Sequence, residues 1–298
     1  ISGTPIENSL EDLWSLMSLA VPGLLSSHSS FNEKFRRPIE AGRSPDLLNL
    51  LHSLIAPFVL RRTKEEVAPE LPERVETLLP VPLGRKQRQI YDRYLTRERA
   101  RLLHLELEND TRERFEVLAA LTRLRQLSLD PALVDQRYDS VGSAKIDLLC
   151  EHLEQILPLG HKVLVFSQFV AFLERIRHSL DQRGIRSLLL EGKTRNRHAV
   201  IDEFQHGDVQ VFLISLKAGG VGLTLTQADY VYMMDPWWNP SVEAQAVNRA
   251  HRIGQDRRVN VYRLVAQDTI EEKVCQLQAH KQLLVDSVVG QNLGEGRS

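Results

Sequence analysis

The feature of this chain that most restricts its fold is an alternation of short apolar segments with amphipathic ones over residues 144–264. The segments that resemble strands are 162–167, 187–190, 209–215, 230–234 and 259–264. Apolar residues recur at helical spacing in 144–157, 170–183, 197–206 and 241–253. Short strands that are apolar throughout and alternate with helices are typical of a parallel sheet covered on both faces. The sequence therefore predicts an α/β domain over 141–266.

The residues before this domain have a mainly helical pattern. Asn8 or Ser9 can cap the first helix, which carries apolar residues at helical spacing. Proline disfavours helical geometry in the residue before it, so an extended linker is indicated by the prolines at 69, 72, 80 and 82. We expect a helical insertion with its linker over 9–84 and a helical protrusion over 85–140.

The end of the chain predicts one more helix. Asp268 and Glu271 have the spacing of a capping box, so 267–298 is interpreted as a C-terminal helical brace and tail. The chain begins at Ile1, inside an ordered-looking motif, so we expect it to be a fragment of a longer protein.

Bulk properties exclude several classes of function. The formal net charge is −1, so an argument for nucleic-acid binding must rest on local patches. The two cysteines, Cys150 and Cys275, lie in apolar helical patterns and are interpreted as buried thiols rather than as a disulfide or metal site. The sequence contains no apolar run of about 18 residues and no signal peptide, which argues against membrane and secreted proteins.

Three short motifs resemble parts of nucleotide-binding sites in residue type, but not in spacing or structural context. Gly192-Lys193-Thr194 follows an apolar strand, but Ser187 stands where a phosphate loop requires glycine. Asp202-Glu203 falls on an amphipathic helix rather than at the end of a buried strand. Gly220-Val221-Gly222 begins like a dinucleotide fingerprint, but position 225 is Leu225. We therefore find no complete nucleotide site in the sequence.

The strongest pattern of candidate site residues lies in 243–254. On the expected helix, Gln245 and Arg249 are four residues apart and Arg249 and Arg252 are three apart, so their side chains share one stripe. Two guanidinium groups on adjacent turns could reach separate oxygens of one γ-phosphate, because arginine stays charged and offers a planar fork of donors. The alternative is a surface helix with ordinary exposed arginines.

Two loops after strands carry further candidates. Ser215 and Lys217 lie at the end of a buried strand and could hold phosphate oxygens, and the glycines that follow would let a ligand approach the backbone closely. A plain tight turn is the alternative. Trp237 and Trp238 follow the next strand, where they could stack against nucleic acid or anchor the loop to the core.

These segments together resemble the Swi/Snf family of superfamily-two helicase-like ATPases. Residues 2–8 resemble the last motif of that family's first RecA-like lobe, and 58–64 resemble its helical-insertion signature. The motifs of the second lobe are matched in order by 162–169, 215–225, 235–240 and 245–255. The resemblance covers nearly the whole chain, and the run Asn-Arg-Ala-His-Arg-Ile-Gly-Gln over 248–255 is highly specific.

The resemblance implies two RecA-like lobes that close over ATP and Mg²⁺ and bind double-stranded DNA across both. The family's first lobe supplies the phosphate loop and the magnesium-binding acids. In this chain it is represented only by its last motif, over 1–8. The first lobe of the same protein is therefore an expected partner, and the fragment alone is expected not to hydrolyse ATP. The resemblance predicts no metal ligand in this chain.

Roles carry over by position where the motifs match. Arg249 and Arg252 match the paired arginine fingers of the family. The resemblance implies ATP contacts for Gln245, Gly220 and Gly222. It implies a role in coupling hydrolysis to lobe movement for Gly3 and Thr4. It implies contacts to the DNA backbone for Ser167, Gln168, Ser215, Lys217 and Trp238. One departure is Thr224, where the family usually has asparagine.

The leading hypothesis is the C-terminal motor half of an ATP-dependent translocase that moves on duplex DNA without separating its strands. A rival within the enzyme class is a strand-separating or RNA-directed helicase lobe. A rival from another class is a non-catalytic module that binds DNA or a partner. The expected place of action is the nucleoid in the bacterial cytoplasm, or the nucleus if the source is eukaryotic.

Overall fold

The computed structural model describes residues 9–42, 44–59, 68–102, 111–218 and 223–289. The chain divides into two compact units. The larger unit consists of Glu70–Trp237 and Val242–Cys275. The smaller unit consists of Ile1–Pro69, Trp238–Ser241 and Gln276–Ser298.

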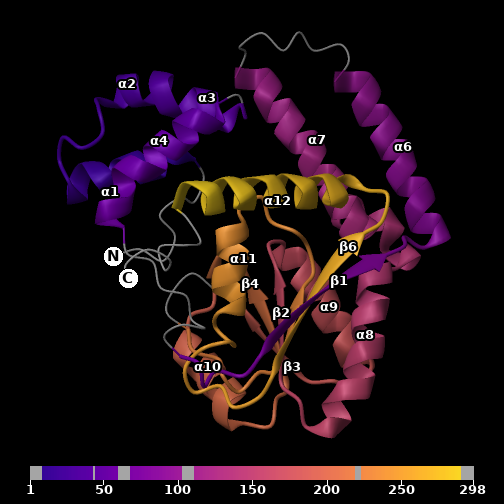
Figure 1. Ribbon diagram of the computed structural model, residues 1–298. Helices are drawn as coiled ribbons and strands as arrows, with labels where there is room; N and C mark the ends of the chain where they lie inside the picture. Colours follow the sequence, from indigo (N-terminus) through magenta and orange to yellow (C-terminus); the bar gives the residue numbers. More distant parts are fainter. Residues whose placement is uncertain (1–8, 43, 60–67, 103–110, 219–222, 290–298) are drawn as a thin grey trace. The chain divides into compact units, whose positions relative to one another are not determined.

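A six-stranded parallel sheet is the framework of the larger unit (Figure 1). Its strands are β1 (Arg74–Val81), β2 (Val163–Ser167), β3 (Ser187–Leu190), β4 (Val211–Ser215), β5 (Tyr230–Met233) and β6 (Val259–Ala266). They lie in the order β1-β6-β5-β2-β4-β3, and every neighbouring pair is parallel. The strands predicted between 162 and 264 and the parallel α/β class are confirmed.

Strand β1 is the main departure from the expected organisation. Residues 74–81 were expected to be part of a linker, but they pair with β6 over the full length of the strand, from Arg74 beside Val259 to Val81 beside Ala266. The segment contains Pro80, which lacks a backbone N–H and is tolerated on an edge strand because only one side of it is paired. Its burial alternates along the chain, as expected where one face of an edge strand stays open to solvent.

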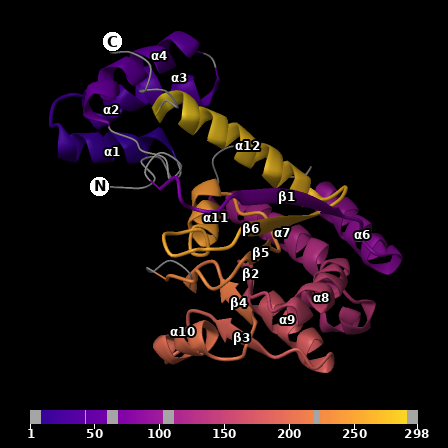
Figure 2. The ribbon, with the colours of Figure 1, turned by 60° about the horizontal axis from the view of Figure 1, so that its bottom comes forward.

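Helices cover both faces of the sheet, as Figure 2 shows. They are α8 (Ala144–Ile156), α9 (Val170–Gln182), α10 (Arg197–His206) and α11 (Pro240–Val247). The α8 and α9 side packs Leu149 and Phe172 against Val165. The α10 and α11 side packs Phe204 and Val247 against strand residues of the opposite face. Strands covered on both faces explain the continuous apolar runs seen in the sequence.

The region between β1 and α8 is helical, as expected, and clusters with the sheet in the larger unit. It contains α6 (Arg85–Leu102), α7 (Thr111–Leu129) and two short 3₁₀ turns, η3 (Pro131–Leu133) and η4 (Gln136–Val141); a third turn, η5 (Leu157–Leu159), follows α8. Tyr91 of α6 and Leu127 of α7 lie in one buried cluster. The Gln87 amide donates to the carbonyls of Leu127, Ser128 and Leu129, and this ties the start of α6 to the end of α7.

The smaller unit has its own helical core. Its elements before residue 59 are α1 (Leu10–Ala20), α2 (His28–Phe31), the π-helical turn η1 (Asn32–Arg36), α3 (Arg37–Glu40), α4 (Pro45–Ile55) and the 3₁₀ turn η2 (Ala56–Phe58). Leu10, Phe31 and Leu51 are fully buried together. The predicted cap is confirmed at Ser9, whose hydroxyl accepts from Glu11 N while Asp12 accepts from Ser9 N.

The last helix, α12 (Ile270–Val289), begins differently from the prediction. Thr269, not Asp268, provides the cap, because the Thr269 hydroxyl accepts from Glu271 N at 3.2 Å. Glu271 does not reach back to a cap residue; it is fully buried, and its Oε2 accepts from Ala266 N at 2.8 Å. The predicted capping box is therefore wrong. Among the helices that the structure describes, none is long and apolar enough to cross a membrane.

Candidate functional site

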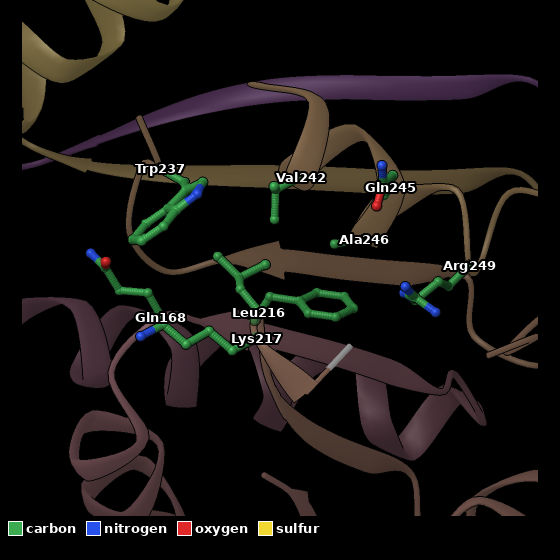
Figure 3. A pocket seen from close by; sticks show the side chains of 9 residues that line it. Gln168, Leu216, Lys217, Trp237, Val242, Gln245, Ala246 and Arg249 are labelled. Carbon is green, nitrogen blue, oxygen red and sulfur yellow. The ribbon is translucent and has the colours of Figure 1, made fainter. Parts of the chain in front are cut away.

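A pocket of about 220 Å³ lies where the carboxyl ends of β2 and β4 face α11 (Figure 3). Open parallel sheets bind ligands at this edge, because the loops that follow the strands gather there. The residues that line it are Phe166, Gln168, Leu216, Lys217, Trp237, Val242, Gln245, Ala246 and Arg249. Figure 3 shows Arg249 at one end, with Gln168, Lys217 and Trp237 towards the other.

Arg249 gives its end of the pocket a positive charge. The residue is 8% exposed, and its Nε has no hydrogen-bond partner among the described residues. Burial lowers the pKa of Arg249, and the nearby charge of Arg252 lowers it further, but a guanidinium stays protonated in proteins. No ion pair joins Arg249 to a carboxylate in the described part of the chain. A buried cation without a counter-charge is unfavourable, so this arrangement favours an anionic ligand.

The arginines do not lie on a helix, contrary to the prediction for 241–253. Helix α11 ends at Val247, and the backbone then turns, with Arg249 N donating to Ala246 O at 3.2 Å. Leu225 N donates to Arg249 O at 2.9 Å, which fixes this turn against the segment that follows β4. After the turn, Ala250 is buried, whereas Ile253 is 74% exposed.

Arg252 lies outside the pocket. It is exposed, and its Nη1 donates to Thr224 Oγ1 at 3.4 Å. Thr224 is the position at which the sequence departs from the expected asparagine, and its hydroxyl here contacts the second predicted arginine finger. The turn therefore presents the two guanidinium groups differently, because Arg249 faces the pocket while Arg252 lies at the surface.

Polar side chains from three further segments complete the pocket. Gln168 follows β2, and its Nε2 is buried without a hydrogen-bond partner in the described residues. Lys217 follows β4 and is exposed, and Gln245 is exposed on α11. The structure thus brings together four residues that the sequence predicted for two different ligands: Gln168 and Lys217 for DNA, and Gln245 and Arg249 for ATP.

Ser167 and Ser215 are not among the residues that line the pocket. They are 0% and 2% exposed. The Ser167 hydroxyl donates to Asp235 Oδ1 at 2.5 Å and accepts from Phe169 N at 3.1 Å, so it is occupied within the protein. The DNA contact predicted for Ser167 stays a prediction; in this structure a neighbouring carboxylate and a backbone amide use the donor and the acceptor of its hydroxyl.

Asp235 is a buried site residue that the sequence did not single out. It is 1% exposed, it accepts from Ser167 Oγ and Gln168 N, and it lies 3.7 Å from Arg125 Nη2. Burial raises the pKa of Asp235 from 3.8 to about 6, although the Ser167 hydrogen bond and the Arg125 charge act in the opposite direction. Only its position in the loop after a buried strand could have signalled this role.

This pKa gives a stability prediction with a definite sign. Because the folded-state pKa of Asp235 lies above its unfolded value, its contribution to stability is present below pH 3.8 and is lost as pH rises through about 6. We expect wild type to lose about 2 kcal/mol of unfolding free energy relative to Asp235→Asn between about pH 4.5 and about pH 8. Urea unfolding of both proteins at the two pH values measures this. A difference that is constant with pH, or that changes in the other direction, would contradict it.

The pocket offers cationic and amide groups for phosphate, but its lining residues supply no carboxylate for a divalent cation. No aspartate or glutamate is among its nine lining residues. Within the described ranges, no group of three His, Cys, Asp or Glu side chains could hold a metal ion. Magnesium ions in nucleotide sites are held by one or two carboxylates together with the phosphates, so this pocket does not supply those ligands.

Comparison with known proteins places the chain in a family. The model of the SNF2-related domain matches residues 1–133, and the model of the helicase conserved C-terminal domain matches 144–254. A protein of Mycoplasma pneumoniae named as an uncharacterized ATP-dependent helicase is 36% identical over 292 residues, which cover 97% of this chain and 27% of that protein. The mouse chromodomain-helicase-DNA-binding protein 1-like is 35% identical over 300 residues, covering 97% and 33%.

Solved structures give the same result for the fold. The SWI2/SNF2 ATPase core of Sulfolobus solfataricus in complex with double-stranded DNA is 33% identical, with a TM-score of 0.60, and the match covers 97% of this chain and 62% of that one. The chain belongs to the Swi/Snf family. Its parallel sheet corresponds to a RecA-like domain of the family's ATPase core. The chain spans about a third or less of the curated relatives named here.

The structure does not test several residues predicted from the Swi/Snf motifs. Gly3, Thr4, Gly220 and Gly222 lie outside the described residues. Trp238 is half-buried and does not line the pocket, whereas its neighbour Trp237 does. The roles predicted for Trp238 and for the glycines stay predictions.

Proposed function

We propose that this chain is the C-terminal motor half of an ATP-dependent translocase that moves along double-stranded DNA. One observation carries the proposal: Arg249 is buried in the pocket wall with no carboxylate partner in the described residues. Triphosphate is a ligand that compensates such a charge, since a guanidinium fork matches phosphate oxygens. The family and its ATP-dependent helicase relatives support ATP as the substrate.

In the proposed mechanism, Arg249 approaches the γ-phosphate when the two lobes of the intact protein close. Its role is to stabilise the charge that develops on the transferred phosphoryl oxygens. Arg252 acts from the surface beside it and Gln245 faces the nucleotide. ATP and Mg²⁺ are held mainly by the first lobe, because the pocket described here lacks carboxylates. On this view the fragment alone binds ATP weakly and does not hydrolyse it.

The DNA contacts are proposed at the other end of the same pocket. Lys217 is exposed at the end of β4, where its ammonium group can pair with a phosphate. Gln168 offers an amide whose nitrogen has no hydrogen-bond partner among the described residues. The DNA contacts predicted for Ser167 and Ser215 belong to the same proposal, although the Ser167 hydroxyl is also bonded to Asp235 and to Phe169 N. The relative from Sulfolobus solfataricus was solved with double-stranded DNA, which supports this class of partner.

An assay on the intact protein distinguishes translocation from strand separation. A duplex that carries a third strand in its major groove is incubated with protein and ATP, in parallel with a forked duplex. We expect ATP-dependent displacement of the third strand and no separation of the forked duplex. Reactions without ATP are the control.

The other outcomes identify the rivals directly. Separation of the forked duplex, or stimulation of ATP hydrolysis by RNA but not by duplex DNA, would replace the proposal with the strand-separating or RNA helicase. Binding of duplex DNA without any nucleotide hydrolysis by the intact protein would favour the non-catalytic module.

A further inference from the structure

We propose that Arg125 is a positioning residue that holds Trp237 in the wall of the pocket. The inference rests on the proposed function for its effect on activity, but the placement of Trp237 can be measured without it. Arg125 lies on α7, in the helical region that precedes the sheet, and no motif in the sequence marks it. The residue is 4% exposed, and arginine is rarely buried to this degree without a structural or functional role.

The Arg125 side chain contacts the loop after β5 and the loop after β2. Its Nη2 donates to Pro236 O at 2.5 Å and lies 3.7 Å from Asp235 Oδ2. Its guanidinium carbon lies 5.7 Å from the centre of the Trp237 ring and 5.7 Å from that of Phe169. The Arg125 guanidinium group therefore contacts the Pro236 carbonyl, the Asp235 carboxylate and the Trp237 indole.

A second side chain, that of Glu243, also holds Trp237. Glu243 of α11 is 2% exposed, and its Oε1 accepts from Trp237 N at 2.6 Å. Its other oxygen is paired with Arg263 of β6, which also contacts Glu76 of β1 through a 3.0 Å bond. Trp237 is thus held at its amide by Glu243 and at its ring and preceding carbonyl by Arg125.

Because of these contacts, the position of Trp237 in the pocket wall depends on α7, a helix that precedes the inner strands in the sequence. Trp237 lines the pocket with Gln168, Lys217 and Arg249, so a displacement of the indole changes the space between the proposed DNA and nucleotide contacts. Lysine cannot replace Arg125 fully, because an ammonium lacks the planar fork that donates to a carbonyl while its face lies over an aromatic ring. Glutamine removes the charge and with it the cation–π contacts.

The first test reports the position of Trp237 directly. The intact protein is labelled with 5-fluorotryptophan, and the Trp237 resonance is assigned as the one that Trp237→Phe removes. We expect Arg125→Gln and Arg125→Lys to shift this ¹⁹F resonance, with the smaller shift in the lysine variant. Arg123→Gln is the matched control, since Arg123 lies two residues away on α7 but pairs with Glu98. An unshifted Trp237 resonance in folded Arg125→Gln, or an equal shift in Arg123→Gln, would overturn the proposal.

The second test is kinetic. We expect Arg125→Gln to lower DNA-stimulated kcat/KM for ATP hydrolysis by about 10- to 100-fold, as small displacements in active sites do, with partial recovery in Arg125→Lys. If Arg125 acts through Trp237, then Arg125→Gln adds little to Trp237→Ala in the double variant. Fully additive losses would overturn the proposal. A shifted resonance in a protein that never hydrolyses ATP would retain the placement of Trp237 and reject only the proposed function.

Discussion

Replacing Arg249 by alanine is expected to lower DNA-stimulated ATP hydrolysis of the intact protein by about 10³-fold or more, the range of other arginine fingers. ATP binding should be largely kept, because the phosphate loop and magnesium ligands are proposed to lie in the other lobe. The reason is electrostatic: the charge of Arg249 is buried, unpaired within the described residues and directed into the pocket. Steady-state hydrolysis and fluorescent-nucleotide binding measure the two effects.

Stability provides the control for this result. Arg249→Met removes a buried cation that has no carboxylate partner in the described chain, so its melting temperature should equal or exceed that of wild type. Arg258→Ala is the matched variant for activity, because Arg258 is an exposed arginine whose Nε lies 3.5 Å from Glu73. We expect Arg252→Ala to follow Arg249→Ala in activity. Unchanged turnover in Arg249→Ala would reject the arginine-finger assignment.

Replacing Lys145 by methionine is expected to destabilise the larger unit by about 3–5 kcal/mol. Lys145 is fully buried, and its Nζ donates to Glu271 Oε2 at 2.6 Å, Met234 O at 2.6 Å and Leu264 O at 2.9 Å. The variant would leave Glu271 buried and charged without its partner, which is more costly than the loss of a surface pair. Urea unfolding followed by circular dichroism measures the change.

A paired variant separates the ion pair from packing. Glu271→Gln in the Lys145→Met background removes the unpaired buried charge of Glu271, so we expect it to restore part of the lost stability. Full recovery is not expected, because the carbonyls of Met234 and Leu264 still lack the donor that Lys145 provides. A double variant less stable than Lys145→Met alone would show that the unpaired charge is not the cause.

The sheet could be predicted from sequence because each inner strand is buried on both faces. A strand such as 163–167 leaves a continuous apolar run, and the helices beside it leave a helical period. Strand β1 left no such signal, since one of its faces is open to solvent and it contains Pro80. Its place in the sheet depends on pairing with β6, and no local pattern within 74–81 encodes that partner.

The site was predictable only in part, because part of it depends on contacts between segments distant in sequence. Motif spacing brought out Gln168, Lys217, Gln245 and Arg249, and the structure places all four in one pocket. Helical spacing across 241–253 was misleading, because the backbone turns after Val247. A hydrogen bond from Leu225 N to Arg249 O holds this turn, and Leu225 is distant in sequence.

The buried polar groups could not be predicted from the sequence, because charged residues in helical patterns are normally interpreted as solvent-exposed. Arg125, Lys145 and Glu271 look like solvated positions on helices, and only the tertiary structure shows that they are buried. Asp235 and Glu243 owe their roles to partners distant in sequence, such as Arg125 and Arg263.

The pairing of β1 with β6 has a consequence for synthesis on the ribosome. Arg74–Val81 leaves the ribosome before every other strand of the sheet, yet its partner Val259–Ala266 is made last. Until then the nascent polypeptide carries an unmatched strand, and contacts between such distant segments form slowly. Pro80 and the alternating charges of Arg74 and Glu76 reduce the risk that another copy of the chain pairs with it during that wait.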